Sequence, residues 1–286
     1  MKRIWIIPIL ILSLLLQACT LKNPYRSRTT TDTTEEEQDM STEPVYTYRS
    51  EEARALEVYL STDDTFYQRI MSKTRNEFGD DRYEPKNLIP LSPAITPEGK
   101  EILLEVRAAN AVSAMLAEMA HDGIRDVMVT SGYRSNERQS YLFDLYLKNE
   151  KKSFTDEAYA CLGADYIEEK YDLARDTGLD ADDALRVVLS YAAEPGKSEH
   201  QTGLCVDLIN ASMTELTNEF ESGASFSWLA DNAHRFGFIL RYPKDKTDLT
   251  GYAYESWHYR YVGRDVAVRI HEEGITLEEY RESLKA

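Results

Sequence analysis

The segment SEHQTGLCVD, residues 198–207, joins a glycine-containing turn to an apolar run that predicts a β-strand over residues 204–209. Successive side chains of a strand point to opposite faces, so Asp207 should share one face with Cys205. His200 precedes this strand, and the turn at Gly203 can return its imidazole toward Asp207. The segment therefore indicates a pair of metal ligands at one end of a buried strand.

A second segment, ESWH at residues 255–258, contributes another histidine and another carboxylate. His200, Asp207 and His258 together offer N, O and N donors, which would leave the fourth position of a tetrahedral zinc ion to water. Glu255 would then lie beside that water and accept its proton as a general base. The spacing alone leaves a second interpretation equally open, in which these groups belong to the surface or to a satisfied core.

The rest of the chain alternates between helical and strand-like patterns. No βαβ repeat is visible, which favours an α+β fold with helices packed on a small antiparallel sheet. Residues 150–192 look helical but are unusually polar, and we interpret them as an insertion or lid. Helices are expected at residues 102–119, 136–147, 227–236 and 264–283, and strands at residues 126–130, 204–209, 238–242 and 257–262.

The composition restricts the class of protein. A hydrophobic fraction of 42% is enough for a packed core, which excludes wholesale disorder. Asp plus Glu number 50 against 33 Lys plus Arg, and a net charge of -17 argues against nucleic acid or anionic lipid as a partner. Three cysteines are too few for a disulfide scaffold. No protein partner is predicted.

The N-terminus has the pattern of an export signal. Lys2 and Arg3 precede an apolar stretch at residues 4–16, which ends at Ala18-Cys19. This ending resembles a bacterial lipobox, in which the signal is removed before a cysteine that carries a diacylglycerol. The alternative is an ordinary secretory signal with an incidental cysteine. We expect an extracytoplasmic protein anchored to the cell membrane through Cys19.

This interpretation divides the chain into three parts. Residues 1–18 are the expected signal peptide, and residues 19–50 combine the lipidated cysteine with a flexible tether rich in Thr and Glu. Residues 51–286 then form the globular domain.

Three ordered motifs resemble a known family. SxHxxGxAxD and ExWHxRYVG occur here as residues 198–207 and residues 255–263 (ESWHYRYVG), and SGYRS stands upstream at residues 131–135, followed by Gln139. The chain is similar in these motifs to the VanY-type D-alanyl-D-alanine carboxypeptidases, zinc peptidases related to lysostaphin-type enzymes and to the hedgehog domain. The resemblance covers about residues 84–265.

The resemblance implies an α+β domain whose central antiparallel sheet carries the zinc site. One zinc ion per chain would be bound by His200, Asp207 and His258, with Glu255 as the catalytic base. The same pocket would bind substrate through Arg134, Gln139 and Ser198, with Arg134 contacting either the substrate's carboxylate or the scissile carbonyl. A guanidinium forms two charge-assisted hydrogen bonds with a carboxylate, as recognition of a peptide C-terminus requires.

Two features depart from the family pattern. Cys205 replaces the usual alanine on the strand face of Asp207, and we interpret it as a small buried hydrophobe rather than as a soft extra ligand. The interval between Gln139 and Pro195 is longer than the family minimum, so the polar stretch within it is expected to reshape the substrate groove.

The predicted function is removal of the C-terminal D-alanine from peptidoglycan stem peptides by a zinc-dependent D,D-carboxypeptidase. An L,D-carboxypeptidase acting on tetrapeptide stems is the alternative within the same class, and the sequence does not decide between them. An endopeptidase is disfavoured because Arg134 suits a chain end. A non-catalytic wall-binding lipoprotein is the alternative of another class, but such a protein would not need Glu255.

Overall fold

The structure is a computed structural model that describes residues 46–92, 94–153, 185, 188–189 and 191–285. Cys19, the predicted signal peptide, most of the predicted tether and most of the predicted insertion lie outside the described residues. Tyr48 and Ser50 are already buried, so the packed part of the chain includes residues before 51. Among the described helices, none has the length and apolarity needed to cross a bilayer.

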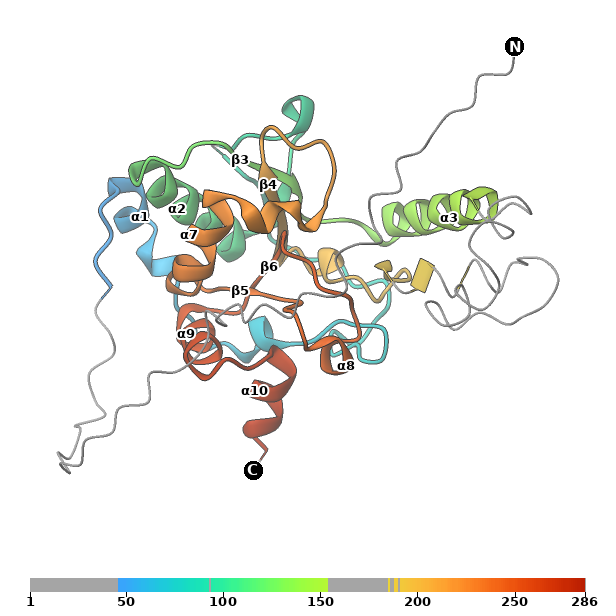
Figure 1. The fold of residues 1–286 in the computed structure, drawn as a ribbon. Coiled ribbons are helices and arrows are strands. Elements are labelled where there is room, and N and C mark those ends of the chain that lie inside the picture. The colour runs from blue at the N-terminus through green and yellow to red at the C-terminus, as the bar shows by residue number, and fades with distance from the viewer. Residues whose placement is uncertain (1–45, 93, 154–184, 186–187, 190, 286) are drawn as a thin grey trace, which may run out of the picture. The chain divides into compact units, whose positions relative to one another are not determined.

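A four-stranded antiparallel sheet lies at the centre, in the order β3-β4-β6-β5 (Figure 1). Its strands are β3 (Val127–Ser131), β4 (Cys205–Asn210), β5 (Phe238–Leu240) and β6 (His258–Tyr261). The register places Asp207 of β4 opposite His258 of β6 on one side and Ser131 of β3 on the other. The three sequence motifs therefore meet on adjacent strands.

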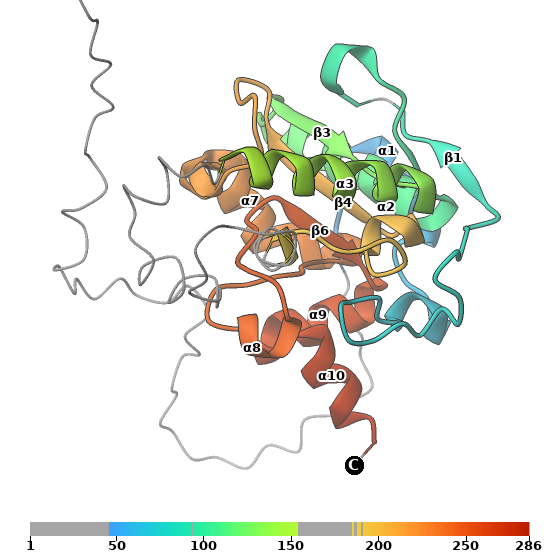
Figure 2. The ribbon, with the colours of Figure 1, turned by 90° about the vertical axis from the view of Figure 1, so that its right-hand side faces the viewer.

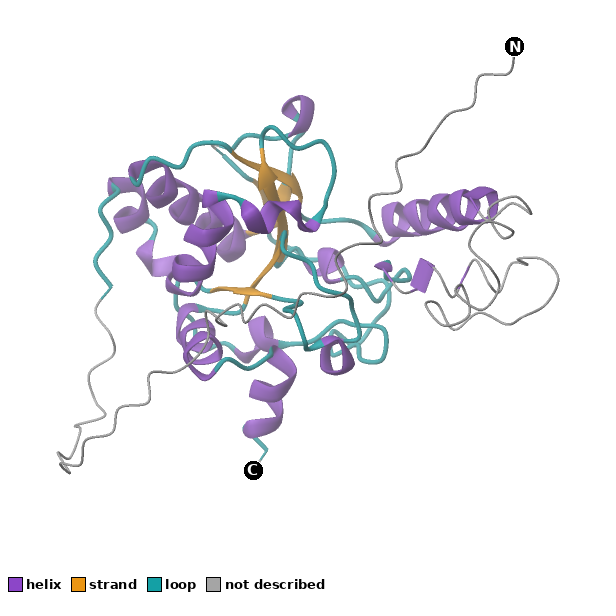
Figure 3. Ribbon diagram, viewed as in Figure 1, coloured by secondary structure: helices purple, strands orange, loops and turns teal. Residues whose placement is uncertain are grey.

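Helices enclose this sheet, as Figure 3 shows. Helix α2 (Val106–His121) and helix α3 (Asn136–Ser153) lie on opposite sides of β3 and β4 (Figures 1 and 2). The larger hydrophobic core joins α2 to the sheet through Val112, Met115 and the apolar side chains of β4. The other described α-helices are α1 (Glu51–Ala55), α7 (Ala224–Asn232), α8 (Thr247–Thr250), α9 (Arg264–Glu273) and α10 (Leu277–Ser283). The prediction of an α+β fold with helices packed on a small antiparallel sheet is confirmed.

The predicted helix at residues 102–119 begins later than its composition suggests. Leu103–Glu105 form strand β2, which pairs with β1 (Leu88–Pro90) in a second, two-stranded sheet. The Glu105 carboxylate accepts hydrogen bonds from the amides of Arg107 and Ala108 and so caps the helix that follows. A side-chain cap of this kind fixes the start of a helix, and α2 therefore begins at Val106.

The C-terminal segment was predicted as one helix and forms two. Helix α9 ends at Gly274, which adopts a φ of 64°, a left-handed conformation that glycine tolerates. Helix α10 starts again with a capping box between Thr276 and Glu279. Figures 1 and 2 both place α8, α9 and α10 at one end of the sheet, where α9 and α10 share a second core with Ile239.

Candidate metal centre

The three predicted metal ligands converge where β4 pairs with β6. Asp207 lies directly opposite His258 in the register of the two strands. His200 belongs to a 3-10 helix, Glu199–Thr202, that ends at Gly203 with a φ of 69° and turns into β4. All three side chains are buried. The turn and the strand pairing together form the cluster that the sequence predicted.

The distances within this cluster fit a small cation. His200 Nε2 lies 3.1 Å from Asp207 Oδ2, and His258 Nδ1 lies 3.1 Å from Asp207 Oδ1. In a tetrahedral zinc site, bonds of about 2.0–2.2 Å separate neighbouring ligand atoms by roughly 3.3–3.6 Å. The N, O and N donors are those that zinc accepts, so the residues present fit this ion in type.

The backbone fixes the orientation of His200. Its Nδ1 lies 2.7 Å from the carbonyl oxygen of Gly132, an interaction in which the imidazole donates and so leaves Nε2 free as a ligand. Gly132 is itself closely packed, because an added Cβ would lie 2.7 Å from the carbonyl oxygen of Leu103. The glycine of the SGYRS motif therefore allows the close approach that orients this histidine.

The electrostatics of the cluster favour a cation. Burial alone would raise the pKa of Asp207, but the imidazoles of His200 and His258 hold it far below the usual range of a carboxyl. Burial likewise opposes the charged form of His200, yet Asp207 raises its pKa to about 9. Asp207 is thus an ionised carboxylate that stabilises positive charge beside it, on an imidazolium or on a bound metal.

Glu255 lies beside the predicted ligands but farther from His258 than Asp207 does. Its Oε2 is 3.6 Å from His258 Nδ1. Burial raises the pKa of Glu255 to about 7, and the nearby Asp207 acts in the same direction, whereas His258 and His200 oppose it. A carboxyl whose pKa is close to neutral can exchange a proton with water under ordinary conditions, as a general base must.

Arg134 connects the cluster to an open cavity of about 550 Å³, which is lined by Arg134, Asp207 and Arg138 among others. The guanidinium donates to Gln139 Oε1 at 2.7 Å and to Ser131 Oγ at 3.2 Å. Among the described residues no carboxylate forms an ion pair with it. Arg134 is therefore held in place by neutral groups and retains the capacity to bind an anion.

The two other predicted substrate-binding residues are not among the described residues that line this cavity. Gln139 is buried and donates from Nε2 to the carbonyl oxygen of Ala193 at 2.6 Å while accepting from Arg134. Ser198 is also buried, and neither residue lines the cavity at Arg134. Gln139 thus positions Arg134, and direct contact of Gln139 or Ser198 with a substrate stays a prediction.

Cys205 lies closer to the ligands than the sequence indicated. Its free, buried thiol and the two histidines form a group whose ligand atoms lie within 4.8 Å of one another. Burial would raise the pKa of Cys205, but His200 and His258 lower it to about 7. Two atoms bonded to one zinc ion are separated by at most about 4.4 Å, so this bound is compatible with the thiol as a further ligand. The Asp207 oxygens lie 3.1 Å from the same two histidines and offer the carboxylate ligand of the predicted set.

Glu199 is a buried residue of the centre that the sequence analysis missed. Its Oε1 accepts from Arg241 Nε at 2.9 Å and from Arg260 Nη1 at 2.7 Å. Its Oε2 lies 3.7 Å from His258 Nε2, on the side of the ring away from Asp207. The only signal in the sequence was its place within the SxHxxGxAxD motif, next to His200.

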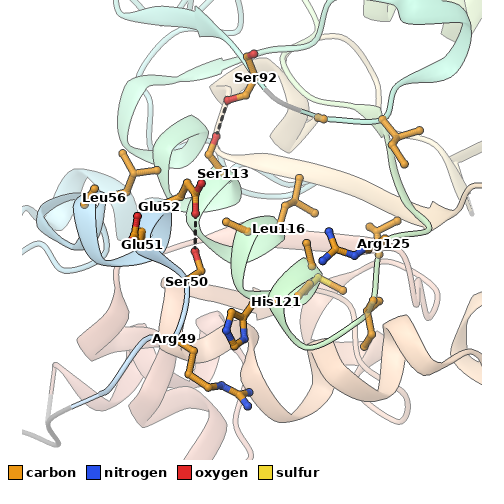
Figure 4. A pocket seen from close by; sticks show the side chains of 18 residues that line it. Arg49, Ser50, Glu51, Glu52, Leu56, Ser92, Ser113, Leu116, His121 and Arg125 are labelled. Atoms are coloured by element: carbon orange, nitrogen blue, oxygen red, sulfur yellow. Dashed lines mark hydrogen bonds between the residues drawn. The ribbon is translucent and has the colours of Figure 1, made fainter.

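A larger cavity, of about 1010 Å³, lies elsewhere, between α1 and α2 (Figure 4). None of the predicted site residues that the structure describes lines it. Its rim carries charges of both signs, including Arg49, Glu51 and Arg125, over an apolar floor that includes Leu116. The volume of a cavity therefore does not identify the candidate site, whereas the converging ligand residues do.

Comparison with known proteins agrees with this geometry. The family described as VanY, D-alanyl-D-alanine carboxypeptidase, matches residues 101–264, more than half of the chain. The chain is 36% identical to YodJ of Bacillus subtilis over 208 residues, which are 71% of this chain and 63% of that protein. It is 35% identical to a D-alanyl-D-alanine carboxypeptidase of Enterococcus faecalis over 177 residues, 62% of this chain and 55% of that enzyme. The chain thus spans less than two-thirds of the length of either relative.

Solved structures share the fold. The LdcB LD-carboxypeptidase superimposes with a TM-score of 0.57 at 33% identity and covers 74% of this chain and 84% of its own. VanYB in complex with D-alanine-D-alanine gives 0.55 at 29% identity, over 76% and 98% of the two chains. A VanY D,D-pentapeptidase variant in complex with Zn(II) gives 0.54 at 29% identity, over 75% and 98%.

We predict that Cys205 is dispensable for metal binding, because the family motif carries alanine at this position. In Cys205→Ala, zinc affinity should stay within about threefold of wild type, because His200, Asp207 and His258 supply three ligands without the thiol. Competition with a chromophoric chelator measures this affinity, and Cys205→Ser serves as a control that keeps the size of the side chain. A loss of more than about tenfold in both variants would instead make the thiol a ligand.

Proposed function

The chain belongs to the VanY family of D-alanyl-D-alanine carboxypeptidases, and from this we propose that it is a zinc-dependent D,D-carboxypeptidase that removes the terminal D-alanine from peptidoglycan stem peptides. The observation that carries the proposal is the convergence of His200 Nε2, Asp207 and His258 Nδ1 beside Glu255. The complexes of VanY relatives with Zn(II) and with D-alanine-D-alanine support the choice of metal and substrate.

His200, Asp207 and His258 would hold the ion. A bound zinc ion supplies a Lewis acid that polarises the scissile carbonyl and makes a water molecule more acidic. Glu255 accepts the proton of the attacking water and delivers it to the departing amine, as the water oxygen bonds to the carbonyl carbon and the C–N bond breaks. The products are free D-alanine and a peptide shortened by one residue.

Arg134 gives the reaction its preference for a chain end. A terminal carboxylate can form two parallel hydrogen bonds with the guanidinium fork. Gln139 and Ser131 already hold that fork in place, so little side-chain freedom is lost when the substrate binds. The cavity that Arg134 and Asp207 both line is the proposed path of the peptide.

L,D-carboxypeptidase activity on tetrapeptide stems is a second candidate. The similarity to the LdcB LD-carboxypeptidase, at 33% identity, favours it. Both reactions use the same ligands, base and carboxylate contact, and they differ in the configuration of the residue before the scissile bond. A non-catalytic wall-binding protein has less support, because it would not need Glu255 poised beside the ligands.

We also propose that the protein acts outside the cytoplasmic membrane as a lipoprotein. Lys2, Arg3, the apolar residues 4–16 and the Ala18-Cys19 junction support this. A lipid at Cys19 would keep the enzyme next to the newly made wall, where stem peptides still carry their terminal alanine.

The activity and the role of Glu255 are tested together with pentapeptide and tetrapeptide stems, whose products are identified by mass. Wild type should release D-alanine from the pentapeptide. Glu255→Ala should bind nearly stoichiometric zinc but lose about 100-fold or more in turnover, because the base is not a ligand. His200→Ala and His258→Ala should lose both zinc and activity. Release of alanine from the tetrapeptide alone would favour the L,D reaction, and full activity of Glu255→Ala would refute the assigned base.

Recognition of the chain end is tested by pairing a change in the enzyme with a change in the substrate. Amidation of the terminal carboxylate removes a charge-assisted contact of about 1.5–3 kcal/mol, so wild type should lose roughly ten- to a hundredfold in kcat/KM. In Arg134→Ala the free acid should already be cleaved poorly, and amidation should matter little further. Equal penalties in both enzymes would show that another group recognises the carboxylate.

The anchor is tested by Cys19→Ser. Without the thiol no diacylglycerol can be attached, so the variant should remain unlipidated and should not be processed as a lipoprotein. Metabolic labelling with a fatty-acid analogue and fractionation of membranes measure the two effects. Unchanged labelling in Cys19→Ser would place the lipid elsewhere or exclude it.

A further inference from the structure

The carboxylate of Glu199 is fully buried, and among the described residues only one of its two oxygens accepts hydrogen bonds. Its Oε1 accepts from both Arg241 and Arg260. Its Oε2 and the Nε2 of His258 are buried atoms, and within the described residues neither has a hydrogen-bond partner. These two atoms face each other at 3.7 Å. A buried acceptor and a buried ring nitrogen thus lie 3.7 Å apart, without another hydrogen-bond partner among the described residues.

Both arginines are fixed at their other ends, so the carboxylate cannot easily turn. Arg241 Nη1 donates to Glu278 of α10 at 3.0 Å. Arg260 Nη2 donates to the carbonyl oxygens of Arg69 at 2.8 Å and Tyr67 at 3.2 Å. Rotation of Glu199 would break two charge-assisted hydrogen bonds in the interior. The direction of Oε2 toward His258 is therefore imposed by the surrounding chain.

We propose that Glu199 is a positioning residue for the metal centre, which accepts the Nε2 proton of His258 and so keeps Nδ1 free to bind the metal beside Asp207. A neutral imidazole carries one proton, and the nitrogen that ligates must be the other one. The hydrogen bond requires the two atoms to approach by roughly 0.5 Å from their present separation. The ring of Tyr242, with its centroid 4.9 Å from that of His258, limits motion of the imidazole in other directions.

This inference rests on the proposed function, since it assumes that the cluster binds a metal. A purely structural role for Glu199 must be separated from it, because a carboxylate between two buried arginines is also needed for their neutralisation. Both roles predict a loss of stability when Glu199 is changed. Only the positioning role predicts that metal affinity falls in a Glu199 variant and does not fall in a control variant with a similar loss of stability.

Glu199→Gln in the full chain separates the two roles. The arginines can only donate, so the amide oxygen must face them and the amide NH₂ must face His258. Nε2 would then have to accept, and the imidazole proton would move to Nδ1, where it competes with the metal. Zinc affinity, measured by chelator competition at neutral pH, should fall about ten- to a hundredfold.

Glu278→Gln is the matched control. It removes the other carboxylate that binds Arg241, at the distant end of the same guanidinium, and does not touch His258. It should lower the melting temperature but leave zinc affinity within about threefold of wild type. Equal zinc affinity in Glu199→Gln and wild type would overturn the proposal, as would an equal loss in both variants.

A measurement on wild type decides the matter if Glu199→Gln does not fold. In the zinc-loaded protein with ¹⁵N-labelled histidine, the spectrum of His258 should show a proton on Nε2 that exchanges slowly with solvent. A proton on Nδ1, or an Nε2 proton that exchanges as fast as that of an exposed histidine, would overturn the proposal. Wild type that binds zinc but cleaves no stem peptide would refute the proposed activity alone.

Discussion

The rest of the site depends on the antiparallel pairing of β4 with β6, which sets Asp207 opposite His258. A buried carboxylate is costly unless opposite charge surrounds it, and here two imidazoles lie 3.1 Å from its oxygens. A slip of one residue in this register would turn Asp207 to the opposite face of the sheet and separate it from His200. The strand pairing and the metal centre are therefore one structural feature, and a change that loosens one should loosen the other.

A layer of buried charge supports this centre from behind. Glu199 joins two arginines, and through them the chain near residues 67–69 and helix α10 are connected to the ring of His258. Buried ion pairs of this kind often add little net stability, because removing the charges from water costs about as much as their attraction returns. Their value is geometric: each guanidinium accepts only a few arrangements of its partners. Segments that lie far apart in the sequence thus fix the direction of a single carboxylate.

The sequence predicted the elements of the fold and the residues of the site that depend on local sequence patterns. The apolar runs at residues 126–130 and 204–209 became β3 and β4, and the motif residues His200, Asp207 and His258 met as expected. Residues 103–105 were misassigned because Leu and Glu favour helices, whereas pairing with β1 made them a strand. Glu199 escaped notice because its partners stand 42 and 61 residues away, and no local pattern connects them. Cys205 was placed on the correct strand face, but its distance from the imidazoles depends on the turn at Gly203.

The charge of the cavity shows how a strongly acidic chain could accept the acidic substrate proposed for it. With a net charge of -17, the protein as a whole repels a peptide that ends in a carboxylate. The cavity beside Asp207 reverses this sign, because Lys100, Arg134 and Arg138 line it and Asp207 is the only carboxylate among the lining residues that the structure describes. An internal peptide segment would cover Arg134 with neutral groups and displace its water molecules. It offers no carboxylate to replace the hydrogen bonds that the guanidinium made with water. The proposed preference for a chain end would thus follow as much from the cost of binding a wrong substrate as from attraction to the correct one.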